Sequence, residues 1–170
     1  AFDITTATYS GVELDTTSEA TSLQGLAINP TGTRLIVVGS TPDLLLQYNL
    51  SAGFDLSTAT YSGNSFNTLS QANNPNDLTV NPAGTRLFTC DQTSGDVHQY
   101  NLTTAWDLST ISYTGKRQDI DNLLYAPVGL SYDTTGKRLY VGGSGEYYAG
   151  GSFGDARLKQ YDLYTAYELY

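Results

Sequence analysis

The sequence contains no methionine, and it has only one cysteine and one histidine among its 170 residues. A single cysteine excludes a disulfide framework within the chain and any metal site built from several thiolates. Lys and Arg number 8 against 17 Asp and Glu, so the net charge is −9 and a nucleic-acid partner is disfavoured. No apolar run approaches the roughly 20 residues of a membrane-spanning helix. Since even position 1 is not methionine, we expect a processed or excised chain.

Charged residues are also scarce, at 15% of the chain. Glycine and tyrosine are abundant instead, with 17 and 14 copies, and serine and threonine are frequent. Tyrosine and threonine favour strands, and no long window of the sequence shows the 3.6-residue periodicity of an amphipathic helix. The composition therefore predicts an all-β protein.

An internal repeat organises the whole chain. The segment AFDITTATYSG recurs twice with an offset of 52 residues, as GFDLSTATYSG and AWDLSTISYTG. The motif QYNL also recurs at this offset, but its third copy, QYDL, follows after 61 residues, so the third unit carries nine extra residues. The repeat divides one domain, residues 1–170, into units at 1–52, 53–104 and 105–165, with a fourth beginning at 166–170.

Each unit contains four short runs that are typical of strands and are bounded by Gly, Pro, Asn or Asp. In the first unit these runs are residues 25–29, 33–39, 44–50 and 58–63. Four strands in a unit of about 50 residues are typical of a propeller blade. The sequence therefore predicts an all-β propeller segment of three four-stranded blades, each of about 52 residues.

The repeat also resembles a known family. GLAINPTGTRLIVV (25–38), DLTVNPAGTRLFTC (77–90) and GLSYDTTGKRLYVG (129–142) resemble the core of YVTN-type β-propeller repeats. The longer unit, with F/W-D-L-S-T-A-x-Y-S-G, is similar to repeat proteins of bacteria and bacterial viruses, which are often surface or virion proteins. The resemblance implies a propeller fold and an extracellular, cell-surface or virion location.

Three blades leave two blade faces without a neighbour, whereas propellers typically have four to eight blades. Exposed apolar faces are association surfaces, so we expect a protein partner or self-association through the blade faces. A second copy could complete a six-bladed ring, or further blades could belong to a longer chain. In another arrangement, residues 1–11 complete the last blade of a neighbouring molecule.

The loops that vary between units fall on one face of the predicted propeller, where binding sites commonly lie. The nine extra residues lie there too, within the glycine-rich stretch GGSGEYYAGGSFGDA (142–156). This stretch offers five candidate contact residues for a protein partner or a glycan: Glu146, Tyr147, Tyr148, Phe153 and Asp155. Tyr, Gly and Ser are typical of adaptable recognition loops. The alternative is a loop that packs on its own blade.

Catalytic chemistry finds little support in the sequence. His98 has no second histidine or cysteine as a partner, and Cys90 falls in a predicted inner strand, where a buried thiol is expected. The first strands of the units offer only Asp77 and Asp133 as acidic residues. We therefore predict no catalytic residues, no metal site and no cofactor.

The function predicted from the sequence is a non-enzymatic structural or binding module of an extracellular assembly or virion. Two alternatives stay open, a propeller hydrolase or lactonase and a multivalent lectin. Arginines and acidic residues that recur in every unit, such as Arg34, Arg86 and Asp107, are interpreted as ion pairs of the turns and between blades.

Overall fold

The computed structural model of the chain describes residues 4–120, 126–144, 147–148, 152–153 and 156–169. Strands dominate these residues. The helical elements among them are short 3-10 turns: η1 (Ile4–Thr6), η2 (Leu56–Thr58) and η3 (Leu108–Thr110). Within the described part of the chain, no helix has the length and apolar character needed to cross a membrane.

Two sheets have four antiparallel strands that follow one another in sequence order. The first contains β1 (Ser22–Ile28), β2 (Arg34–Thr41), β3 (Asp43–Leu50) and β4 (Ala59–Asn67). The second contains β5 (Pro75–Val80), β6 (Arg86–Asp91), β7 (Asp96–Leu102) and β8 (Ile111–Asp119). These boundaries agree closely with the four strands predicted for each unit.

The third sheet has three strands among the described residues: β9 (Ala126–Tyr132), β10 (Arg138–Ser144) and β13 (Arg157–Asp162), in the order β13-β10-β9. Between β10 and β13 lies a separate hairpin of β11 (Tyr147–Tyr148) and β12 (Ser152–Phe153). This hairpin is the nine-residue insertion seen in the sequence.

The turn from the first to the second strand shows why the repeated motif has its sequence. Asn29 Oδ1 accepts hydrogen bonds from the backbone N–H groups of Thr33 and Arg34, at 2.8 and 3.0 Å. Gly32 has a φ of +71°, in the left-handed region that favours glycine. Asn81 closes the corresponding turn of the second unit in the same way. The motif is therefore turn chemistry, as the sequence predicts.

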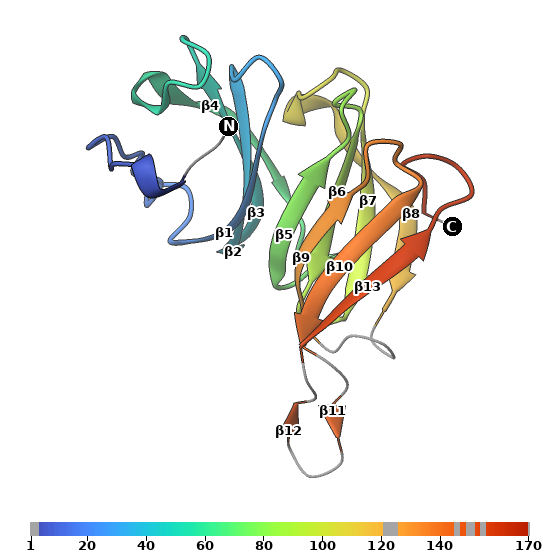
Figure 1. The fold of residues 1–170 in the computed structure, drawn as a ribbon. Coiled ribbons are helices and arrows are strands. Elements are labelled where there is room, and N and C mark those ends of the chain that lie inside the picture. Colours follow the sequence, from blue (N-terminus) through green and yellow to red (C-terminus); the bar gives the residue numbers. More distant parts are fainter. Residues whose placement is uncertain (1–3, 121–125, 145–146, 149–151, 154–155, 170) are drawn as a thin grey trace.

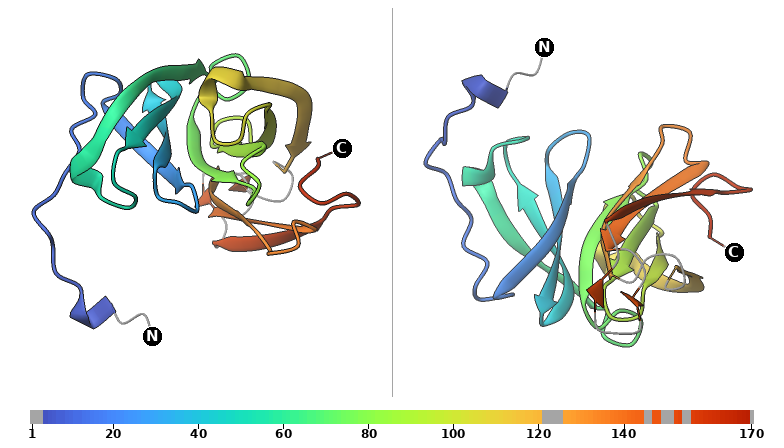
Figure 2. Two further views of the ribbon diagram at one scale, coloured as in Figure 1. Left: turned by 90° about the horizontal axis from the view of Figure 1, so that it is seen from above. Right: turned by 60° about the horizontal axis from the view of Figure 1, so that its bottom comes forward.

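The three sheets fan out from their first strands, as Figures 1 and 2 show. β1 lies beside β5, and β5 lies beside β9, so the first strand of each sheet faces the same central region. This arrangement is an arc of β-propeller blades, and the predicted propeller architecture is confirmed. Below, blades 1, 2 and 3 are the sheets that begin with β1, β5 and β9.

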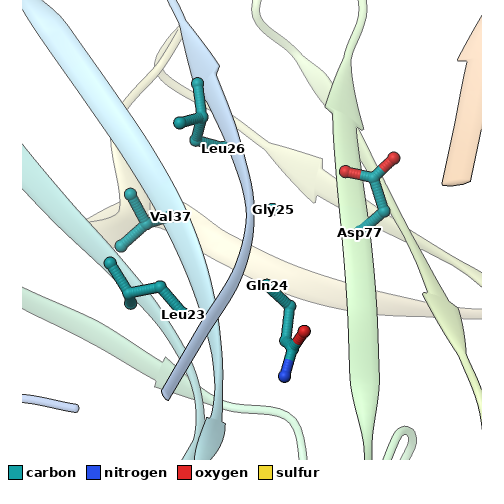
Figure 3. A pocket seen from close by; sticks show the side chains of 6 residues that line it. All are labelled: Leu23, Gln24, Gly25, Leu26, Val37 and Asp77. Carbon is teal, nitrogen blue, oxygen red and sulfur yellow. The ribbon is translucent and has the colours of Figure 1, made fainter. Parts of the chain in front are cut away.

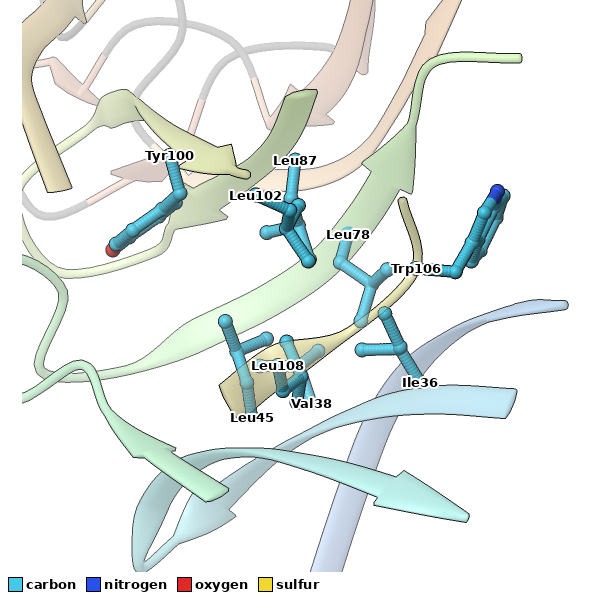
Figure 4. Packing of buried hydrophobic residues seen from close by; sticks show 9 residues of the cluster. All are labelled: Ile36, Val38, Leu45, Leu78, Leu87, Tyr100, Leu102, Trp106 and Leu108. Carbon is cyan, nitrogen blue, oxygen red and sulfur yellow. The ribbon is translucent and has the colours of Figure 1, made fainter. Parts of the chain in front are cut away.

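Apolar side chains fill the spaces between the blades. Figure 4 shows the cluster between blades 1 and 2, where side chains of β2 and β3 meet those of β5, β6 and β7. A second cluster joins blade 2 to blade 3 and includes Phe88, Val97 and Leu139. The inner strands bury both of their faces, which explains why β2 and β3 show no clean alternation of apolar and polar residues.

A similar loop follows the third strand of each blade, and two copies of this loop fasten neighbouring blades together. We call residues 54–56, 106–108 and 167–169 the latch loops. Gln47 Oε1 on β3 accepts a hydrogen bond from Leu108 N at 2.8 Å, and Gln99 Oε1 on β7 accepts one from Leu169 N at 2.7 Å. Each of these two latch loops is thus held by the preceding blade.

Candidate functional site

One repeat position on the first strands of the blades carries glycine in two units and aspartate in the other. This position is Gly25 on β1, Asp77 on β5 and Gly129 on β9. A Cβ atom at Gly25 would lie 2.5 Å from Asp77 Oδ1 and 2.8 Å from Asp77 Cα. Gly25 therefore makes room for Asp77, and the carboxyl group lies where the three blades converge.

Asp77 is held by backbone donors from two blades. Its Oδ2 accepts a hydrogen bond from Leu130 N of blade 3 at 2.9 Å, and its Oδ1 accepts one from Leu78 N at 2.8 Å. Burial raises the pKa of Asp77, although both backbone N–H groups act in the opposite direction. A half-buried carboxyl with a raised pKa is a candidate proton-transfer group.

A hollow of about 460 Å³ opens beside this carboxyl. Its lining comes from β1, β2 and β5: Leu23, Gln24, Gly25, Leu26, Val37 and Asp77. Figure 3 shows Asp77 and the Gln24 amide on one side of β1, and Leu23, Leu26 and Val37 on the other. Gln24 Nε2 donates to Ser40 Oγ at 3.0 Å, which anchors the amide to β2. The hollow thus combines apolar walls with one carboxyl and one amide.

The sequence alone does not predict this site. Asp77 is one of only two acidic residues on the predicted first strands, and this scarcity was interpreted as evidence against catalysis. Asp133, the other acidic residue considered there, lies in the turn after β9, where its Oδ1 accepts from Lys137 N at 3.0 Å. The signal that marks Asp77 is a break in the repeat, a carboxyl where the other units have glycine.

Three of the five predicted recognition residues lie in the β11–β12 hairpin. Tyr147 pairs with Phe153, and Tyr148 pairs with Ser152, so the backbone brings the three aromatic residues into one hairpin. Glu146 and Asp155 lie outside the described residues. In Figure 1 the hairpin projects beyond the ends of β10 and β13, away from the three sheets. Contact with a partner through these residues stays a prediction.

His98 and Cys90 are both buried in the blade interior, and Cys90 on β6 is the cross-strand partner of Asp77. His98 is buried in β7, where burial lowers its pKa, and neither ring nitrogen has a hydrogen-bond partner among the described residues. Cys90 is buried in β6, and burial raises the pKa of its thiol to about 12, which suppresses the thiolate. Within the described ranges, no three His, Cys, Asp or Glu side chains form a group suited to a metal ion.

Arg34 and Arg86 form ion pairs between blades, as the sequence predicts, whereas Arg138 pairs with Asp162 of its own blade at 3.7 Å. Arg86 Nη2 lies 2.8 Å from Glu168 Oε1, and Arg34 Nη1 lies 3.6 Å from Asp107 Oδ2. Burial alone would raise the pKa of Glu168, but hydrogen bonds from Lys116, Arg86 and Gln99 lower it to about 2. These residues join blades and belong to the scaffold.

Comparison with family models finds no match, and comparison with curated proteins finds none either. Solved structures do match. A “putative 6-phosphogluconolactonase” from Bacteroides uniformis has a TM-score of 0.56 and 12% identity, over 84% of this chain and 42% of that one. A structure of the same description from Bacteroides fragilis has a TM-score of 0.57 and 14% identity, over 83% of this chain and 39% of that one.

A luciferin-regenerating enzyme gives a TM-score of 0.58 with 13% identity, over 88% of this chain and 49% of that one. This chain therefore spans less than half the length of each of these three structures. At such identities the likeness shows the fold. The prediction that the chain is not an enzyme is nevertheless contradicted, because several structures with this fold are named as lactonase-type or other enzymes.

Proposed function

We propose that this chain contributes to a propeller hydrolase that opens small cyclic esters of the lactone type, with Asp77 as the proton-transfer group. The observation that carries the proposal is Asp77 itself, a half-buried carboxyl beside a 460 Å³ hollow at the convergence of three first strands. The names of the structural neighbours suggest the substrate class.

The chemistry of lactone opening needs a base and then an acid. The Asp77 carboxylate accepts a proton from a water molecule as the water oxygen attacks the acyl carbon. The ring C–O bond then breaks, and the alkoxide that leaves takes the proton from Asp77, which yields a hydroxy acid. Burial moves the pKa of Asp77 toward the working pH, where a carboxyl exchanges protons most effectively.

The surrounding residues suit this role. The two backbone N–H groups that bind Asp77 fix the position of the carboxyl group between blades 2 and 3. Gln24, anchored on Ser40, offers an amide at the edge of the hollow, and Leu23 and Leu26 provide apolar contact for a substrate ring. A substrate would approach Asp77 from the side that faces β1.

The test is an assay of the purified chain with a panel of five- and six-membered lactones, including a phosphorylated sugar lactone. Each hydrolysis releases a carboxylic acid, which a pH indicator follows. We expect acceleration over the buffer rate, and we expect Asp77→Asn to lose roughly 10²–10⁴-fold of it. Asp133→Asn is the matched control, because Asn29 and Asn81 occupy that position in the other units.

Two results would contradict the proposal. One is an Asp77→Asn variant as active as the unmodified chain. The other is a chain that leaves every lactone at its spontaneous rate while its circular dichroism spectrum shows the folded β-sheet protein.

A second function, recognition of a protein partner or a surface glycan in an extracellular or virion setting, is favoured by the projecting β11–β12 hairpin. The test is binding to a glycan array and to candidate partner proteins after Tyr147→Ser and Tyr148→Ser. Tyr164→Ser is the control, because Tyr164 is 90% exposed but lies outside the hairpin. Loss of binding only in the hairpin variants supports this function, and unchanged binding contradicts a role for the two tyrosines.

A further inference from the structure

Blade 2 carries a group of buried polar side chains at repeat positions where blade 1 has aliphatic residues or glycine. Four positions on one face of the sheet change together between the two units. Blade 1 has Val37, Gly39, Leu44 and Leu46 at these positions, and blade 2 has Thr89, Asp91, Asp96 and His98. The four residues of blade 2 are at most 2% exposed. A blade does not require these polar groups, since blade 1 folds without them.

These side chains lie on the side of blade 2 that faces blade 1. Alternate residues of a strand point to the same side of the sheet. Tyr100 and Leu102 of β7 belong to the apolar cluster between blades 1 and 2 (Figure 4), whereas Val97 belongs to the cluster between blades 2 and 3. His98 is two residues from Tyr100 and therefore faces blade 1. Both faces of blade 2 are covered by neighbouring blades that the structure describes.

A row of aromatic rings connects His98 to blade 1. The His98 and Tyr113 ring centroids are 6.0 Å apart, and those of Tyr113 and Tyr100 are 5.5 Å apart. Tyr100 in turn packs edge-on against Phe66 of β4, with centroids 5.5 Å apart. The last three rings belong to, or pack against, the apolar cluster that joins the two blades. A charge on His98 would therefore act directly beside the rings that hold blade 1 on blade 2.

The surroundings of the His98 imidazole favour its neutral form. Neither ring nitrogen has a hydrogen-bond partner among the described residues. Burial is the largest influence on the pKa of His98 and lowers it, and Arg117 on β8 acts in the same direction. Asp96 and Asp91 act in the opposite direction, but Arg117 Nη1 lies 2.6 Å from Asp96 Oδ2 and offsets that charge.

Blade 1 covers the imidazole without supplying an anion to it. Asp43, at the start of β3, interacts electrostatically with Asp91 and is not among the groups that shift the pKa of His98. Tyr100 and Tyr113 are the other titratable neighbours, and burial raises the pKa of both, so they stay uncharged. Among the described residues, no carboxylate of blade 1 therefore compensates a proton on His98.

We propose that proton uptake by His98 separates blade 1 from blade 2, so that this junction is closed at neutral pH and opens in mild acid. An imidazolium ion needs acceptors or water at both of its N–H groups, and burial without them is costly. Separation of the blades admits water to the ion and breaks the contact between Phe66 and Tyr100. Because the open form binds the proton more tightly, its population rises by up to about tenfold for each pH unit below the ordinary pKa of 6.5.

The effect can be isolated because the chain has a single histidine. Asp77 and Asp43 also have raised pKa values, but their protonation favours the folded form and so acts with the opposite sign. The inference stands independently of the catalytic proposal, since His98 does not line the hollow beside Asp77.

The experiment measures hydrogen exchange at two amides that fasten the blades. The Leu108 N–H group is bonded across the junction of blades 1 and 2, and the Leu169 N–H group across that of blades 2 and 3. From about pH 7 to about pH 5, the protection factor of Leu108, corrected for intrinsic exchange, should fall at least about tenfold. That of Leu169 should stay within about twofold. In NMR spectra the imidazole should titrate below pH 6.5.

Two variants separate the proton from the polarity of the cluster. His98→Leu introduces the residue that blade 1 has at this position, and it should abolish the acid dependence at Leu108. Thr89→Val also introduces the blade 1 residue, but it keeps the imidazole, so the acid dependence should persist. Circular dichroism confirms that each variant is folded, and His98→Gln replaces His98→Leu if the latter fails to fold.

Any of five results would overturn the inference. Protection at Leu108 does not change with pH, or Leu108 and Leu169 lose protection equally, as in general unfolding. The acid dependence survives the removal of His98, or it disappears in Thr89→Val. Finally, the imidazole titrates at or above pH 6.5, as an ion pair with Asp96 would produce.

Discussion

The first and second latch loops have nearly the same sequence, FDL and WDL, but different surroundings. Trp106 is 8% exposed and Leu108 is 2% exposed, because blade 1 covers them. Phe54 is 65% exposed, and Leu56 is only half-buried. The repeat determines the conformation of the loop, since Phe54 and Trp106 share a positive φ of about 60°. A preceding blade determines whether the loop contributes to stability.

The largest effect should come from truncating the covered aromatic residue. Trp106→Ala removes a side chain from the cluster between blades 1 and 2, and we expect a loss of about 3–5 kcal/mol in the free energy of unfolding. Phe54→Ala should cost no more than about 1 kcal/mol in dilute solution. Denaturant titration of both variants measures the difference, and equal losses would show that the neighbouring blade is irrelevant.

A smaller effect is expected from the glutamine that holds the latch loop. Gln47→Ala leaves the buried N–H group of Leu108 without its acceptor, which should cost about 1–3 kcal/mol. Gln160→Ala is the matched change in blade 3, where the Gln160 side chain holds no latch loop among the described residues, and it should be nearly neutral. The same denaturant titration tests both. A neutral Gln47→Ala would show that the apolar contacts alone hold blades 1 and 2 together.

Glu168 should make the junction between blades 2 and 3 sensitive to acid. Its pKa lies at about 2 in the folded chain, below the ordinary 4.5, so its contribution is present above pH 4.5 and is lost as the pH falls toward 2. We expect this contribution to be about 1–2 kcal/mol, reduced by the solvent exposure of the pair. The free energy of unfolding of the Glu168→Gln variant should not show the corresponding decrease between pH 4.5 and pH 2.

Asp77 should produce the opposite and smallest effect. Its pKa is raised above the ordinary 3.8, so the folded chain binds the proton more tightly than the unfolded chain does. Stability should therefore fall as the pH rises from 3.8 through the folded-state pKa. Asp77→Asn should remove this slope, as thermal unfolding at successive pH values would reveal. A slope that persists in the variant would assign it to another group.

The sequence predicted the blades well because strands and turns are local and are repeated three times. The NPTGT turn and the Arg86–Glu168 ion pair follow from residues that recur at a fixed offset. The axial site could not be predicted so readily. Asp77 acquires its raised pKa from burial against β1 and β9, which are distant in sequence, and one residue that breaks a repeat does not show what surrounds it.

The most direct test of the comparison between the two latch loops is amide hydrogen exchange at Leu56 and Leu108. The Leu108 N–H group donates to Gln47 Oε1 of blade 1 at 2.8 Å and is covered by that blade, whereas Leu56 is only half-buried. We predict that the Leu108 N–H group exchanges as slowly as the inner strands do, and that the Leu56 N–H group exchanges much faster. Equal protection at the two positions would contradict the account.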